Sequence, residues 1–274
     1  MPEARVASGF EFGIASDVGR KRKGEPNQDA VILVLPKPAD IYPPMMVLAD
    51  GMGGRKGGAI ASQLLVDTMQ AEYLKLNLPS IRTSDLVDCI NSAHQKIRQK
   101  GLADDELSDM GTTVVASVLT ENRLMVVNVG DSRAYLLRGS EIRQISQDQS
   151  WVADQVRRGL LSVEEARQHP KRNRLTMSVS AKRPTVTPVT TEVELAKQDI
   201  ILLCSDGLWG SVPNSLIWAA ANEFPPQEAA DRLVAFANTS QGPDNISVII
   251  ARQQDWKPVQ GKSNTNETTN PGIS

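Results

Sequence analysis

Short apolar segments separated by turn residues dominate the hydrophobic pattern of this 274-residue chain. Short runs rich in Val, Ile and Leu between turn residues are typical of β-strands. We therefore predict strands at residues 11–16, 30–35, 45–49, 112–119, 123–129, 132–138, 141–145, 191–195, 199–205 and 245–252. Tight turns join the strands between residues 112 and 145, which predicts an antiparallel meander there.

Apolar residues three or four positions apart predict amphipathic helices in other parts of the chain. Residues 59–74 are expected to form one such helix. Its apolar face comprises Ile60, Leu64, Leu65, Met69 and Tyr73. A second helix is expected to begin at a cap formed by Thr83 or Ser84, and two more near Pro213 and Gln227.

The pattern changes between residues 150 and 188. Residues 151–158 are predicted to be helical, and a capping box that starts at Ser162 predicts a second short helix. We interpret this stretch as a flap inserted into a single domain that spans residues 1–252. Residues 253–274 are polar and contain almost no apolar side chains, which predicts a disordered tail.

Runs of antiparallel strands interrupted by helix pairs, without alternating βαβ units, are typical of an α+β fold. We predict a four-layer α/β/β/α sandwich, in which two packed, mainly antiparallel sheets are flanked by helix pairs. This arrangement would bury every apolar face described above. It would also bring several strand ends together at one rim.

Composition limits the possible partners. The chain has 30 Lys and Arg residues against 32 Asp and Glu residues, so nothing favours nucleic acid or an anionic membrane as a partner. No apolar run approaches the ~20 residues that span a bilayer, and the polar start lacks the regions of a signal peptide. We therefore expect a cytoplasmic protein that acts as a monomer. Cys89 and Cys204 are far apart, and Cys204 lies in an apolar strand, which favours a packed thiol.

Aspartates stand at strand ends in three separate parts of the chain. Asp50 and Asp206 follow apolar segments, and Asp244 directly precedes one. Carboxylates gathered at one sheet edge repel one another unless cations lie between them. The cations that suit all-oxygen ligands are Mg²⁺ and Mn²⁺, which keep several water ligands and support hydrolysis or phosphoryl transfer. Each aspartate alone could be a turn or cap residue, so the metal hypothesis depends on the set.

Five motifs, in this order and spacing, carry a family resemblance. They are Asp-Gly-Met-Gly-Gly at 50–54, Met-Gly-Thr-Thr at 110–113, Asn-Val-Gly-Asp-Ser at 128–132, Cys-Ser-Asp-Gly at 204–207 and Gly-Pro-Asp-Asn at 242–245. Together they resemble the metal-dependent serine/threonine protein phosphatases of the 2C class, in their bacterial form, over residues 13–251. The resemblance implies a β-sandwich flanked by helices and a Mg²⁺ or Mn²⁺ centre that hydrolyses phosphoserine and phosphothreonine.

The same resemblance implies roles for individual residues. Asp50 would bridge two tightly bound metal ions, and the carbonyl of Gly51 would coordinate one of them. Asp206 and Asp244 would complete the shell of the first ion, and Asp29 would hold metal-bound water. Two cations can lower the pKa of a bridging water and neutralise the phosphoryl oxygens, so that hydroxide attacks without a protein nucleophile.

Asp109 directly precedes the Met-Gly-Thr-Thr motif, where bacterial relatives carry an acidic residue implicated in a third metal position. The resemblance therefore implies a third, weakly bound cation at Asp109. The alternative is that Asp109 simply ends a flexible acidic loop. The implied partners are phosphorylated proteins, including a serine/threonine kinase or its substrates.

The phosphate-gripping arginine of the family usually lies a few residues before the acidic pair, but residues 24–26 lengthen that loop here. We assign Arg22 as the anion clamp, with Arg20 as the alternative, because a bidentate guanidinium matches phosphate geometry. The other reading is a solvated basic loop at residues 20–23.

Relatives often carry a histidine in the Asp-Gly loop, but Met52 and Arg55 stand at those positions in this chain. A metal-bound water could protonate the leaving group instead, and His169 in the flap is a second candidate. His94 lies on a predicted helix and is interpreted as structural.

Two other functions remain open from the sequence. The protein could hydrolyse small phosphoesters, or it could be a non-catalytic regulator that binds phosphoproteins. The complete aspartate set argues against a purely binding role. The glycine cluster at residues 51–58 does not match the nucleotide-binding fingerprints, so we interpret it as a tight turn beneath the metal site.

Overall fold

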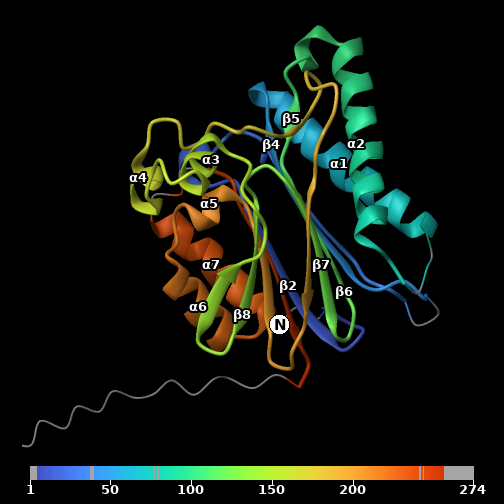
Figure 1. Ribbon diagram of the computed structural model, residues 1–274, viewed down its shortest axis with the longest axis vertical. Helices are drawn as coiled ribbons and strands as arrows, with labels where there is room; N and C mark the ends of the chain where they lie inside the picture. The colour runs from blue at the N-terminus through green and yellow to red at the C-terminus, as the bar shows by residue number, and fades with distance from the viewer. Residues whose placement is uncertain are drawn as a thin grey trace, which may run out of the picture.

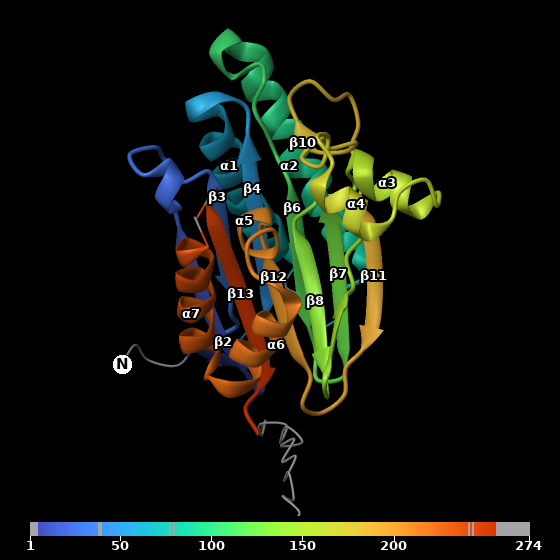
Figure 2. The ribbon, with the colours of Figure 1, turned by 90° about the vertical axis from the view of Figure 1, so that its left-hand side faces the viewer.

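The computed structural model describes residues 5–37, 40–76, 78, 80–240, 242 and 244–255. Two β-sheets lie face to face, and helices cover the outer face of each (Figures 1 and 2). The first sheet contains β1 (Arg5–Ala7), β2 (Phe10–Asp17), β8 (Arg133–Arg138), β9 (Glu141–Gln144), β12 (Ile200–Cys204) and β13 (Ile246–Gln253). The second contains β3 (Asp29–Val34), β4 (Met45–Met52), β5 (Gly111–Thr112), β6 (Val114–Leu119), β7 (Arg123–Val129), β10 (Val179–Ser180) and β11 (Val189–Glu194).

The strand order is β1-β2-β13-β12-β8-β9 in one sheet and β10-β5-β4-β6-β7-β11 in the other, where β3 also pairs with β4. Helices α1 (Gly54–Leu76) and α2 (Thr83–Ala103) cover the second sheet, and α6 (Asn214–Glu223) and α7 (Pro226–Thr239) cover the first. The α+β, four-layer prediction is confirmed.

Each interface between layers has its own buried apolar cluster. Leu65, Met69 and Tyr73 of α1 pack with α2 against one sheet. Leu233 of α7 lies in a second cluster, against the other sheet. Between the sheets, alternate residues such as Leu203 form a third cluster. These clusters hold the layers together, because burial of apolar surface contributes about 25 cal/mol per Å².

The predicted antiparallel meander is wrong at one connection. Strands β6 and β7 pair, as do β8 and β9, but β7 and β8 belong to different sheets. The chain crosses between sheets at Gly130, whose φ of 97° is accessible mainly to glycine. A turn signal cannot distinguish a hairpin from a crossover, because both need the same left-handed residue.

Helix α1 begins at Gly54 rather than at the expected Ala59. Its first turns pack closely on β4, since a methyl group on Gly51 would lie 2.2 Å from the Gly58 carbonyl oxygen. The glycine cluster therefore allows helix and strand to touch through their backbones. Helix α2 begins at Thr83 with Arg82 as its cap residue, one position before the predicted cap.

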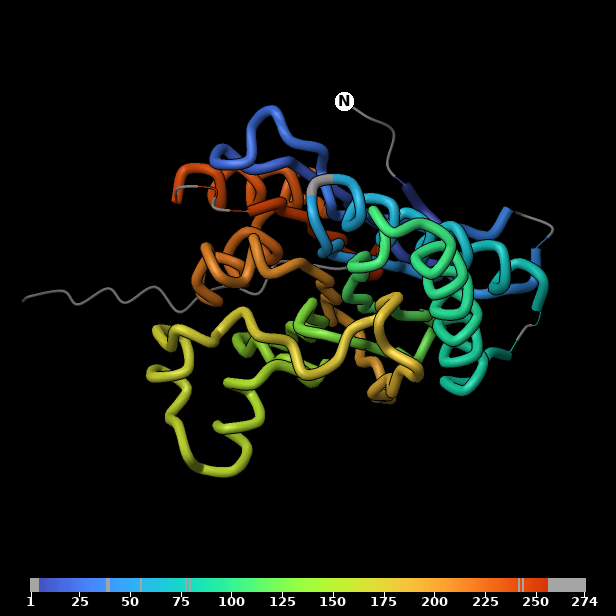
Figure 3. Tube along the Cα trace, turned by 90° about the horizontal axis from the view of Figure 1, so that it is seen from above, coloured from blue at the N-terminus to red at the C-terminus, as the bar shows by residue number. Residues whose placement is uncertain are grey.

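The flap contains α3 (Trp151–Arg157) and α4 (Val163–Gln168), and Ser162 forms the predicted capping box. Viewed from above, the yellow-green flap projects to one side beyond the sheets (Figure 3). The predicted tail falls mostly outside the described residues, since only its first three positions, 253–255, are described. Among the described helices, none combines the length and apolar character that a bilayer crossing requires.

Candidate metal centre

Two of the predicted metal ligands face each other across neighbouring strands. Asp29 is the first residue of β3, and in the antiparallel register it lies directly opposite Asp50 of β4. Like charges at directly opposite positions destabilise a sheet. The backbone of β4 is fixed here by Thr113, whose hydroxyl accepts a hydrogen bond of 3.1 Å from the Asp50 amide. The fold therefore holds an electrostatically unfavourable pair in place.

The other two aspartates come from the opposite sheet. Asp206 begins the one-turn helix α5 (Asp206–Trp209) directly after β12, and Asp244 lies just before β13. A methyl group on Gly207 would lie 2.0 Å from the Asn245 carbonyl oxygen, so these two segments touch through their backbones. The chain thus brings Asp206 and Asp244 close enough for their charges to interact.

Neighbouring polar side chains orient this site. The Ser205 hydroxyl donates a hydrogen bond of 2.8 Å to Oδ2 of Asp29, and it accepts one from the Ser247 amide. The Asn245 side-chain oxygen accepts from the Gln28 amide at 2.9 Å, and its nitrogen donates to the Val18 carbonyl. Ser205 and Asn245 therefore connect residues of the two sheets at the rim.

Burial and mutual repulsion raise the pKa values of these carboxyls. Burial is the main cause for Asp29, and it raises its pKa to about 7. Burial and the charge of Asp244 raise the pKa of Asp206 to about 6. The pKa of Asp50 is raised well above its usual range by burial and by the charge of Asp29. Full ionisation of these carboxyls is therefore unfavourable unless a cation lies among them.

The residues present fit divalent cations. Oδ1 of Asp29 is buried and has no hydrogen-bond partner within the protein, although buried polar atoms are normally satisfied. A cation among the carboxylates would satisfy this atom and remove the repulsion. Within the described part of the chain, no three acidic, histidine or cysteine side chains already stand in an arrangement that could hold a metal ion. The carboxylates would therefore have to close around a cation.

Arg22, rather than Arg20, lies beside the carboxylates. Its guanidinium forms a bidentate ion pair with Asp244, with Nε 2.9 Å from Oδ1 and Nη2 2.9 Å from Oδ2. Arg20 is exposed, and its backbone amide donates to Asn238. The geometry therefore favours Arg22 as the group that could reach a bound anion.

The remaining predicted residues have contacts of their own, with residues other than the four aspartates. Asp109 is 65% exposed and forms an ion pair with Lys182 of the flap. His169 stacks on Trp151 within the flap, with ring centroids 4.7 Å apart. His94 is buried on α2 and hydrogen-bonds the Arg183 carbonyl, as expected for a structural histidine.

Asp131 belongs to one of the five motifs that carry the family resemblance, but the sequence predicted no role for it. Its carboxyl is buried, and burial together with the charge of Asp206 raises its pKa to about 8. The signal that could have found it is in the sequence, because Asp131 closely follows the strand predicted at residues 123–129, much as Asp50 and Asp206 follow theirs. Asp131 is thus a fifth acidic group near the rim.

Comparisons with known proteins find relatives of similar sequence and fold. A family model described as protein phosphatase 2C matches residues 18–245. The protein phosphatase PhpP of Streptococcus pneumoniae is 32% identical over 249 residues, which are 90% of this chain and 98% of that protein. The crystal structure of the serine/threonine phosphatase PstP/Ppp of Mycobacterium tuberculosis superimposes with a TM-score of 0.78 at 32% identity, covering 89% of this chain and 98% of that one. The catalytic domain of PstP, solved in complex with two manganese ions, gives a TM-score of 0.77 at 32% identity and covers 89% and 97% of the two chains.

Proposed function

Because this chain belongs to the protein phosphatase 2C family, we propose that it hydrolyses phosphoserine and phosphothreonine in proteins with divalent metal ions held by its rim aspartates. It is a serine/threonine protein phosphatase, as its relatives are. The observation that carries the metal assignment is the pair of facing carboxylates, Asp29 and Asp50, with a buried oxygen that has no partner in the protein.

Four aspartates and one carbonyl would hold the ions: Asp29, Asp50, Asp206, Asp244 and the backbone oxygen of Gly51. When bound, two divalent cations lower the pKa of a water molecule and neutralise phosphoryl oxygens, which supplies a nucleophile without a nucleophilic side chain. The family relative solved with two manganese ions supports Mn²⁺, and Mg²⁺ would suit the same oxygen ligands.

Arg22 would bind the phosphate. Its guanidinium already makes two parallel hydrogen bonds to a carboxylate, and a phosphate presents the same pair of acceptor oxygens. If Asp244 turns to a cation, Arg22 loses this partner and can take a phosphate in its place. Asp109 would hold a third cation weakly, since a single exposed carboxylate with water ligands binds divalent ions poorly.

The physiological setting follows from this activity. The partners would be phosphorylated proteins, including a serine/threonine kinase or its substrates, within cytoplasmic signal transduction. We expect the enzyme to act as a monomer.

Metal removal tests the assignment. The protein is treated with EDTA, and turnover of a phosphothreonine peptide and of an aryl phosphate is measured before and after Mn²⁺ is restored. We expect no turnover without metal and recovery with Mn²⁺. Asp206→Asn should lower kcat by several orders of magnitude, whereas Asp67→Asn, on the exposed face of α1, should not.

Full activity after exhaustive metal removal would refute the metal mechanism. Efficient hydrolysis of small phosphoesters with none of phosphopeptides would identify a small-molecule phosphohydrolase. Phosphopeptide binding without any turnover would identify a non-catalytic regulator.

A further inference from the structure

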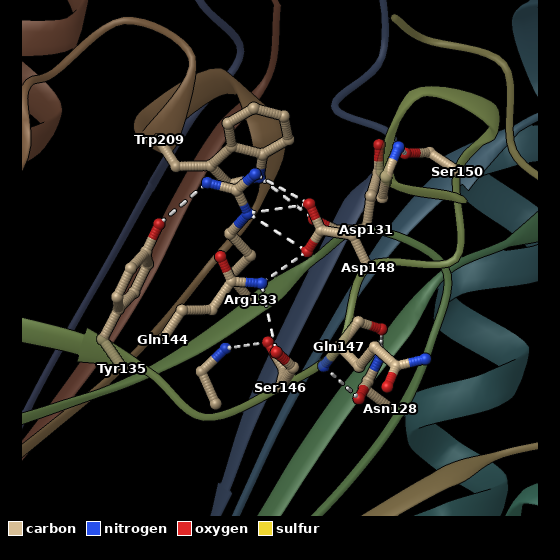
Figure 4. Close-up of polar contacts among 12 residues, drawn as sticks. Asn128, Asp131, Arg133, Tyr135, Gln144, Ser146, Gln147, Asp148, Ser150 and Trp209 are labelled. Carbon is tan, nitrogen blue, oxygen red and sulfur yellow. Dashed lines mark hydrogen bonds and ion pairs between the residues drawn. The ribbon is translucent and has the colours of Figure 1, made fainter. Parts of the chain in front are cut away.

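The guanidinium of Arg133 lies among the side chains of Tyr135, Asp148 and Trp209 (Figure 4). It forms an ion pair with Asp148, in which Nη2 donates to Oδ2 at 2.7 Å and Nε lies 3.2 Å from Oδ1. Nη1 donates to the Tyr135 hydroxyl at 3.0 Å. The Cζ atom of the guanidinium lies over the Trp209 ring, 3.6 Å from its centre. Arginine is suited to this position, because its planar fork can pair with a carboxylate and stack on an aromatic ring at the same time.

Arg133, Tyr135, Asp148 and Trp209 form a polar cluster. On one side this cluster supports helix α5, which carries the proposed metal ligand Asp206. Trp209 is the last residue of α5, and Asp206, the proposed ligand, is the first. The indole Nε1 of Trp209 donates a hydrogen bond of 3.0 Å to the Asp131 carbonyl. The stacked guanidinium and this hydrogen bond together fix the ring, and a ring fixed at one end of a single helical turn restricts the other end.

On the opposite side the cluster is connected to the flap. Arg157 of α3 donates a hydrogen bond of 2.9 Å to the Asp148 carbonyl. The next residue, Gln149, accepts at its carbonyl from the Thr176 amide and donates from its side chain to the Thr187 carbonyl. Asp148 and Gln149 thus contact Arg157 near the start of the flap and Thr176 and Thr187 toward its end. We call this point, where the flap joins the rest of the domain, the base of the flap.

We propose that Arg133 is a positioning residue that joins the base of the flap to α5 and thereby holds Asp206 in the orientation needed to bind a metal ion. The chain of contacts runs from Arg157 through Asp148, Arg133 and Trp209 to α5. This inference rests on the proposed function, because it takes Asp206 as a metal ligand. It adds that the flap and the metal centre are mechanically coupled.

Several properties of the cluster make this connection stiff. The side chain of Asp148 is only 10% exposed, so its ion pair is poorly screened by water. Gln144 donates to the same carboxylate at 2.6 Å, which satisfies it further. Charge-assisted bidentate hydrogen bonds are about twice as strong as neutral ones. Groups hydrogen-bonded directly to a metal ligand commonly change metal affinity by about 10- to 100-fold when they are replaced, and Arg133 acts on Asp206 through Trp209, so we expect an effect at the lower end of that range.

The test compares Arg133→Lys and Trp209→Phe with the unaltered protein. Lysine keeps the charge but loses the bidentate pair and the stacking, and phenylalanine keeps a ring but loses the indole donor. Two quantities are measured for each: the Kd for Mn²⁺ by titration calorimetry, and hydrogen exchange of the amides of residues 151–157. We expect the Kd to rise about tenfold, and exchange in α3 to become faster in Arg133→Lys.

Arg138→Lys is the matched control. Arg138 lies at the far end of the same strand and forms a bidentate pair with Asp199, whose side chain is 2% exposed. Its replacement also breaks a bidentate pair between β8 and a buried carboxylate, and it should leave the Kd for Mn²⁺ and exchange in the flap unchanged. The double variant of Arg133 and Trp209 should weaken Mn²⁺ binding by less than the product of the two single effects, because both changes break one connection.

Lower thermal stability of Arg133→Lys with an unchanged Kd for Mn²⁺ would overturn the proposal and leave Arg133 a structural residue. A changed Kd with unchanged flap exchange, or independent effects in the double variant, would also overturn it. Failure of the metal assignment on which the proposal rests is recognised separately, since the unaltered protein would then bind no Mn²⁺, and failure of the phosphatase activity is recognised by the absence of phosphopeptide turnover in the unaltered protein. Trp209→Phe keeps the test informative if Arg133→Lys does not fold.

Discussion

Replacement of Asp29 by asparagine is expected to stabilise the metal-free protein while it removes the response to metal ions. Asp29 faces Asp50 across two paired strands, and burial raises its pKa to about 7. Asparagine has nearly the same shape without the charge. Its side-chain oxygen can still accept the hydrogen bond that Ser205 donates to Asp29.

The size of the effect follows from the pKa difference between the folded and unfolded chain. Asp29 has a pKa of about 7 when folded, against 3.8 as the ordinary value. Because the folded chain binds this proton more tightly, stability decreases as the pH rises from about 4 to 7. At about 1.4 kcal/mol for each pKa unit, ionised Asp29 costs the fold on the order of 4 kcal/mol at pH 8. Asp29→Asn should therefore raise the Tm by about 5 to 10 °C at pH 8, and the gain should fall below half of that value at pH 5.

Thermal unfolding followed by circular dichroism would measure this effect, with EDTA and with Mn²⁺, at pH 5 and pH 8. The unaltered protein should gain about 2.7 kcal/mol when Mn²⁺ is present at about 100 times its Kd. Asp29→Asn should gain much less, and Asp67→Asn should behave like the unaltered protein. A lower Tm for Asp29→Asn than for the unaltered protein at pH 8, or an equal rise in Tm at both pH values, would contradict this reasoning. Either result would show that the ionised Asp29 side chain does not destabilise the metal-free fold.

Three further changes test separate parts of the site. Arg22→Ala should raise KM for phosphopeptides by about 10- to 100-fold with little change in kcat, because a charged hydrogen-bonded pair contributes about 1.5 to 3 kcal/mol. A larger effect of Arg20→Ala would show that the wrong arginine was assigned. Exchange of flap residues 158–173 for another sequence should change the order of preference among phosphopeptides. Aryl phosphate turnover should stay within about tenfold, which is ~1.4 kcal/mol of activation free energy. Equal loss on every substrate would contradict a role of the flap in specificity. Asp109→Ala should lower kcat about tenfold more on phosphopeptides than on aryl phosphates, because an alkoxide leaving group needs a proton. The change also removes the ion pair with Lys182. Titration calorimetry should still find the two tight metal sites in this variant.

Local patterns predicted most strands and helices, because each carries its own apolar periodicity. Residues 123–129 form β7 as predicted, and α2 begins within one residue of its expected cap. The allocation of β7 and β8 to different sheets could not be predicted, since it depends on which face each strand buries. The early start of α1 depends on backbone contact between Gly51 and Gly58, which no local propensity records.

Part of the candidate site could also be predicted, because some of its residues lie in motifs that are local in the sequence. Short motifs marked Asp50, Asp206 and Asp244, because an aspartate next to the end of an apolar segment is a local feature. The pairing of Arg22 with Asp244 joins residues more than two hundred positions apart. Arg133 directly follows a quoted motif, but its partners Asp148 and Trp209 become neighbours only in the folded chain.

The four proposed ligands come in two pairs, and each pair belongs to a different sheet. Asp29 and Asp50 lie on β3 and β4, whereas Asp206 and Asp244 flank β12 and β13. A cation shared between the pairs would cross-link the two halves of the sandwich at the rim, above the apolar cluster between the sheets. Separation of the sheets would then require release of the ion, which adds to the barrier for unfolding. The supply of divalent metal in the cell would thus influence the lifetime of each molecule against proteolysis as well as its rate of catalysis.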